Sequence, residues 1–194
     1  MHVASTPRIT PLQFSRALDE LRSMRWRPDM VVEEIGSPQR LAPFSIALSA
    51  ELCQDDDMLA NGRLVLLHDP AGNTSWGGTS RIVSYARADV DLEMVADPLL
   101  PDVAWSWMDD ALRQHGADVQ HLTGTVTASY GKAFGDMEGT QNRAEVELRS
   151  SWTPRLGAGD PLLGHLRAWQ DLLGMVAGKP VLPQGIVQFP GVAQ

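Results

Sequence analysis

The stretch that decides the fold is Arg143-Ala144-Glu145-Val146-Glu147-Leu148-Arg149-Ser150-Ser151-Trp152. Small or apolar residues alternate along it with charged residues and serine, which is the period of two that a β-strand shows when only one face is buried. A strand with one wet face is typical of an antiparallel sheet. We therefore expect a sheet that packs against helices on one face and meets water on the other.

The rest of the chain supplies the remaining strands and the helices of this arrangement. Five further strands are predicted at Met30–Ile35, Phe44–Cys53, Arg63–His68, Arg81–Ala88 and Gln120–Tyr130. Three amphipathic helices are predicted to start at N-cap residues, the first at Thr10, the second at Asp102 and the third at Asp160. Most connections are too short for parallel crossovers. The sequence therefore predicts an α+β protein with a two-layer, mainly antiparallel sheet of about six strands and three helices packed mainly on one face.

Length and composition indicate one globular domain. A chain of 194 residues with 43% hydrophobic and 21% charged residues can bury a self-sufficient core. We expect residues 1–194 to form a single domain with an ordered core at about 10–178 and a proline-rich extended tail at 179–194. The single Cys53 cannot form a disulfide within the chain, and neither a signal-peptide core nor a membrane-length apolar run is evident. These features predict a cytoplasmic protein that does not enter a membrane.

Charge argues against a nucleic-acid partner. The formal net charge is −8 and the only lysines are Lys132 and Lys179, whereas a phosphate backbone favours clustered positive charge. The sequence carries no nucleophile elbow, no phosphate-binding loop, no paired-histidine zinc motif and no CxxC motif. His115 and His121 lack the further ligands that a zinc site needs. We therefore expect no cofactor and no metal, and the sequence leans away from an enzyme.

The tryptophans provide the main functional hypothesis. Trp76 lies in a glycine-rich turn, and Trp105 lies at the margin of the apolar arc of the second helix, beside Asp109 and Arg113. Exposed aromatic rings of this kind often anchor a partner. The leading hypothesis is therefore a protein-binding or adaptor domain with an aromatic-rimmed groove at these four residues. The oligomeric state stays open.

Two alternatives remain beside this hypothesis. The first is an enzyme of unrecognised type, such as a hydrolase, that uses His68 together with Glu33 or Arg81. It requires these side chains to converge, because a general base acts only within hydrogen-bond reach of its partner. The second is an acidic structural subunit with a constitutive partner, which predicts a large apolar patch outside any cleft.

Four segments combine rare tryptophan and proline placements in a fixed order. They are Arg40-Leu41-Ala42-Pro43, Leu66-Leu67-His68-Asp69-Pro70-Ala71-Gly72, Ala96 to Trp107, and Ser151-Trp152-Thr153-Pro154. Together they resemble an uncharacterised actinobacterial family, domain of unknown function 3000, over nearly all of the chain. The resemblance implies a cytosolic single-domain protein and supplies no catalytic residues.

Overall fold

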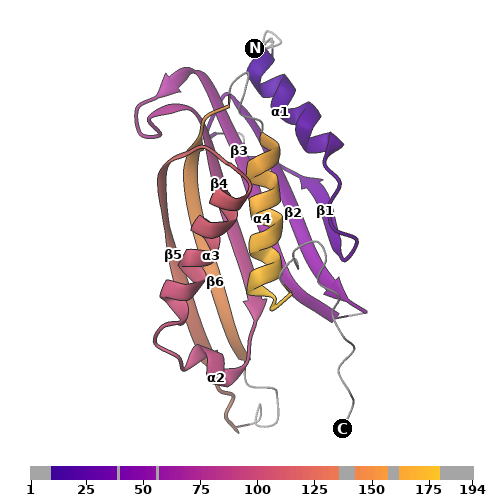
Figure 1. Ribbon diagram of the computed structural model, residues 1–194, viewed down its shortest axis with the longest axis vertical. Helices are drawn as coiled ribbons and strands as arrows, with labels where there is room; N and C mark the ends of the chain where they lie inside the picture. Colours follow the sequence, from indigo (N-terminus) through magenta and orange to yellow (C-terminus); the bar gives the residue numbers. More distant parts are fainter. Residues whose placement is uncertain (1–9, 39, 56, 136–142, 157–161, 180–194) are drawn as a thin grey trace, which may run out of the picture.

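The computed structural model describes residues 10–38, 40–55, 57–135, 143–156 and 162–179. Within them the elements are, in chain order, α1 (Leu12–Ser23), β1 (Met30–Ile35), β2 (Phe44–Gln54), β3 (Asp57–Asn73), β4 (Gly78–Asp89), α2 (Leu92–Val95), α3 (Leu100–Gln114), β5 (Val119–Gly131), β6 (Arg143–Pro154) and α4 (Leu162–Val176). The strands form one antiparallel sheet in the order β1-β2-β3-β4-β6-β5 (Figure 1). This confirms the α+β fold class.

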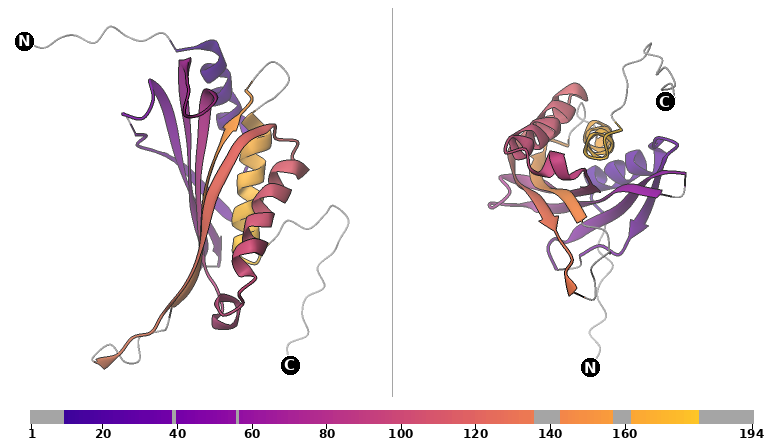
Figure 2. Two further views of the ribbon diagram at one scale, coloured as in Figure 1. Left: turned by 90° about the vertical axis from the view of Figure 1, so that its left-hand side faces the viewer. Right: turned by 90° about the horizontal axis from the view of Figure 1, so that it is seen from below.

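The helices cover one face of the sheet, here called the helix-covered face. α4 runs over the middle of the sheet, with α1 and α3 on either side of it, while none of the described helices lies on the opposite face (Figure 2). The core fills the space between the layers, and its two largest fully buried side chains are Trp152 of β6 and Trp169 of α4. Burying one such ring contributes roughly 2–3 kcal/mol.

The other side of the sheet, here called the helix-free face, carries the charged residues that the sequence pattern predicted. Along β6, every second residue from Ala144 to Trp152 is buried, while Arg149 between them is exposed. The antiparallel register aligns one residue from each strand into a row across this face. That row reads Glu33, Ser49, Arg63, Tyr85, Arg149 and Thr125.

Two predicted helix starts are wrong. The first helix begins at Leu12 with Pro11 as its N-cap, and no side chain caps it. Thr10 therefore does not cap, and the Gln13 side chain instead donates a hydrogen bond to the carbonyl of Leu156. The second long helix, α3, begins at Leu100, so Asp102 lies in its first turn rather than at its cap. There its negative charge interacts favourably with the positive end of the helix dipole. The predicted cap Asp160 lies outside the described residues.

Strand β3 is longer than predicted. It begins at Asp57 rather than after Gly62, because β2 and β3 stay paired up to a tight turn in which Gln54 opposes Asp57. Asp55 adopts a left-handed φ of 55° in this turn. The segment from Asp57 to Gly62 runs Asp-Met-Leu-Ala-Asn-Gly and does not alternate between apolar and polar residues, so the period of two gave no signal there. Among the described residues, no helix is long and apolar enough to cross a membrane.

Candidate functional site

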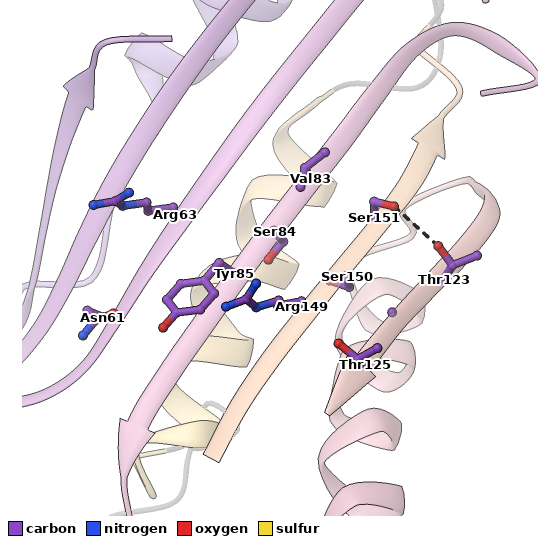
Figure 3. A pocket seen from close by; sticks show the side chains of 11 residues that line it. Asn61, Arg63, Val83, Ser84, Tyr85, Thr123, Thr125, Arg149, Ser150 and Ser151 are labelled. Carbon is purple, nitrogen blue, oxygen red and sulfur yellow. Dashed lines mark hydrogen bonds between the residues drawn. The ribbon is translucent and has the colours of Figure 1, made fainter. Parts of the chain in front are cut away.

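A shallow groove of about 850 Å³ lies on the helix-free face, over β3, β4, β6 and β5. Its lining consists of Asn61, Arg63, Val83, Ser84, Tyr85, Thr123, Gly124, Thr125, Arg149, Ser150 and Ser151. Alternation within each strand turns the larger of these side chains away from the core and into the groove. Figure 3 shows Arg63 and Arg149 on either side of Tyr85, with hydroxyl groups from β5 and β6 along the far wall.

Tyr85 and Arg149 form a braced pair at the middle of the groove. The guanidinium of Arg149 lies over the Tyr85 ring, 5.6 Å from its centroid, in a cation–π arrangement. Arg149 Nε also donates to Glu147 Oε1 at 2.6 Å, and this bond lowers the pKa of Glu147. Burial, together with a hydrogen bond to Glu147, raises the pKa of Tyr85. At neutral pH the pair therefore presents a neutral phenol beside a cation.

Arg81 fixes the hydroxyl-rich wall of the groove. From β4 its guanidinium reaches across β6, donating to Ser151 Oγ at 2.7 Å and to Thr153 Oγ1 at 3.1 Å, and it continues to the carbonyl of His121 on β5 at 3.0 Å. Burial lowers the pKa of Arg81. Since its guanidinium is occupied by these acceptors, Arg81 positions the wall and offers little to a ligand.

The groove is positively charged on an acidic protein. Its only charged lining residues are Arg63 and Arg149, whereas the chain as a whole has a net charge of −8. Arg149 is ion-paired with Glu147, but exposed Arg63 forms no ion pair with any residue that the structure describes. A free guanidinium beside a phenol and several hydroxyls can bind a carboxylate or another anionic group.

The structure separates the four residues expected to rim one groove. Trp105 is half-buried and packs on β5, where a Cβ on Gly124 would lie 2.6 Å from its Cζ3 atom. Asp109 and Arg113 form an exposed ion pair further along α3. Trp76 is also half-buried and belongs to the β3–β4 hairpin, where its carbonyl accepts from the Thr153 side chain.

These contacts lie on different faces of the sheet. The Trp105 ring lies on the helix-covered face, whereas Thr153, which holds the Trp76 backbone, points to the helix-free face together with Arg81. Neither tryptophan lines the groove described above. The two tryptophans therefore take part in different contacts, and a binding role for Trp76, Trp105, Asp109 and Arg113 stays a prediction.

The catalytic alternative is not supported by the geometry. His68 is buried on the helix-covered face, where its Nδ1 atom lies 2.9 Å from Ser80 Oγ and its ring stacks on Phe14. Arg81 lies on the opposite face, and Glu33 is exposed on β1 at the edge of the sheet. The three side chains do not converge.

His165 and His115 have structural surroundings. His165 is fully buried and accepts a hydrogen bond from Trp152 Nε1 at 3.1 Å, and burial lowers its pKa to about 4. His115, at the end of α3, is bonded through Nε2 to Asp171 Oδ2 of α4 at 2.7 Å. Within the described ranges, no three acidic, histidine or cysteine side chains are grouped to hold a metal ion.

Fold and groove together define a two-layer α+β protein whose sheet is open on one face. The chain belongs to a family described as "Protein of unknown function (DUF3000)", whose model matches residues 10–187. No curated protein and no solved structure matches the chain.

Proposed function

We propose that this chain is a protein-binding domain that receives an acidic, extended segment of a partner protein in the groove on the helix-free face. The observation that carries the proposal is a groove whose charged lining residues, among those described, are Arg63 and Arg149, of which Arg63 has no ion-pair partner there, on a protein of net charge −8. Charge of opposite sign steers a partner to such a place and fixes its orientation.

The shape and residue types of the groove suit a peptide better than a small metabolite. It is shallow and open along the strands, whereas small-molecule sites are concave and bury most of the ligand. Tyrosine and arginine are the residue types most enriched among binding hot spots, and Tyr85 and Arg149 are already held in place by each other and by Glu147. This preorganisation lowers the entropic cost of binding.

The proposal is tested with peptides, because it specifies their chemistry. Random peptides displayed on phage are selected on the purified chain and then titrated against Arg63→Glu. We expect the selected peptides to be rich in Asp and Glu and to lose about tenfold or more in affinity for this variant. Arg16→Glu is the matched control, since Arg16 is exposed on α1 in the other layer. Peptides without acidic residues, or equal losses with both variants, would contradict the proposal.

A cytosolic location, expected from the single cysteine, accompanies this proposal as a prediction. It is checked by fractionating cells that produce the chain and detecting it by immunoblot.

A further inference from the structure

The strand β5 has a long, regular free edge. It stands last in the sheet order, and among the residues that the structure describes only β6 pairs with it. From Thr123 to Gly131 its register with β6 is continuous. A strand in this position presents unpaired backbone N–H and C=O groups, which are a template for one more strand.

This edge lacks most of the features that keep edge strands from pairing, such as charged residues, proline and short length. Val119–Gly131 contains no Asp, Glu, Lys, Arg or Pro, and its single irregularity lies between Gln120 and Thr123. The other free edge, β1, is only six residues long and carries Glu33 and Glu34, both exposed. Adjacent carboxylates and short length are common protections of an edge. The two edges of the same sheet therefore differ in their readiness to pair.

We infer that two copies of this chain pair through their β5 edges, antiparallel to one another, into a dimer with one continuous sheet. In β5 the odd-numbered residues from 123 to 129 all carry hydroxyls, being Thr123, Thr125, Thr127 and Ser129. Even-numbered residues from 124 to 128 are Gly124, Val126 and Ala128. Centring the two-fold axis on Val126 or on Thr127 sets hydroxyl residues opposite hydroxyl residues and small apolar residues opposite each other, and such pairs stabilise a sheet.

Net charge favours this edge over other surfaces for self-association. Two molecules with a net charge of −8 repel each other, and contact costs least where neither carries charge. The β5 edge is such a place. After pairing through β5, the free edges of the joined sheet are the two β1 strands. Addition of a third copy through β1 is disfavoured, because Glu33 and Glu34 would then face the same carboxylates of that copy. The assembly therefore closes at two copies.

The dimer gives Trp105 an environment that the single chain does not. Its ring lies half-buried over Gly124, a residue of the edge strand itself. A second copy paired along β5 therefore packs next to this ring. Because Thr123 and Thr125 of β5 also line the groove, the two grooves come to lie next to each other across the two-fold axis. The inference does not depend on what the groove binds.

Sedimentation equilibrium over a concentration series tests the dimer, using the full chain and two variants. Thr127→Lys places an exposed lysine at the middle of the edge, outside the groove. Val31→Lys is the matched control on β1, where Val31 is 57% exposed. We expect twice the chain mass of 21.2 kDa for the wild type and for Val31→Lys. We expect Thr127→Lys to dissociate about tenfold or more readily, because like charges then face each other across the axis.

Each remaining outcome overturns the inference. A wild-type chain that stays monomeric at all concentrations contradicts it, as does a dimer that Thr127→Lys leaves intact or that Val31→Lys disrupts equally. Oligomers larger than two copies contradict closure. Circular dichroism verifies that each variant is folded, and Thr125→Lys replaces Thr127→Lys if the latter is not. Peptide binding by Arg63→Glu is measured separately, so failure of the dimer and failure of the groove proposal are distinguishable.

Discussion

Gly124 of β5 is closely approached both by its neighbour strand β6 and by the Trp105 ring of α3. A Cβ there would lie 2.2 Å from the carbonyl oxygen of Arg149 and 2.6 Å from Trp105, so alanine forces β5 or α3 to move. We predict that Gly124→Ala lowers the free energy of unfolding by about 1–3 kcal/mol, the usual cost of overpacking. Gly131→Ala is the control in the same strand, because its new methyl group would meet nothing closer than 3.9 Å. Urea denaturation measures both, and equal losses would refute the packing explanation.

His165 makes stability depend on pH. Its pKa is about 4 in the folded chain because of burial, against an ordinary value of 6.5. Between these values the unfolded chain binds the extra proton, so the free energy of unfolding falls as pH falls from 6.5 to 4, by roughly 3 kcal/mol at most. We predict that His165→Gln, which keeps an acceptor for Trp152, flattens this part of the pH profile of denaturation midpoints. An unchanged slope would assign the dependence to other groups.

Among the elements, α3 and α4 are joined by a specific polar contact as well as by apolar packing. His115 and Asp171 form a hydrogen bond of 2.7 Å with both side chains largely buried. We predict that Asp171→Ala costs about 2 kcal/mol of stability, since it leaves His115 without its partner. Asp109→Ala removes a carboxylate of α3 that pairs with Arg113 in solvent, and we expect it to leave thermal unfolding essentially unchanged. If both variants unfold alike, the contact adds nothing specific.

The elements that the sequence predicts best are those with one buried and one solvent-exposed face. The alternation around Leu148 in β6 identified both the strand and the sheet face left open, because burial imposes that pattern directly. α2 is only four residues long and has no buried residue, so no periodicity marked it. The predicted caps Thr10 and Asp102 are wrong because neither helix has a side-chain N-cap; before α3, the amide of Leu99 instead donates to Asp97.

The groove could not be predicted from the sequence, for a different reason. Arg63, Tyr85 and Arg149 lie on three strands, and only the register of β3, β4 and β6 places them in one row. Each of them in isolation resembles an ordinary residue on a wet strand face. By contrast, Trp105 could be singled out from its own helix pattern. Its contact with Gly124 could not, because Gly124 lies on β5 and comes next to α3 only in the folded chain. A site built from strand pairing is found only after the strand order is known.

For the molecule as a whole, the structure predicts that unfolding occurs in two parts. α1 lies at one end of the sheet, where Phe14 packs on His68 and Phe44 while Ala17 and Leu21 are also buried, and it has no side-chain N-cap. The centre of the sheet, in contrast, is covered by α4, whose Leu172 is fully buried. Segments with few buried contacts open at a lower free energy than the global transition. We therefore expect amides of α1 to exchange hydrogen through local opening, and amides of β3 and β4 only through global unfolding.

A single substitution far from α1 separates the two processes. Leu148 is fully buried on β6, and Leu148→Ala is expected to cost about 3 kcal/mol of global stability. Native-state hydrogen exchange should then speed up in β3 and β4 by the corresponding factor, whereas α1 should exchange at its wild-type rate, because its opening leaves the packing around Leu148 intact. If α1 accelerates together with β3 and β4, the helix unfolds only with the whole domain. In that case Phe14 belongs to the same cooperative unit as the centre of the sheet.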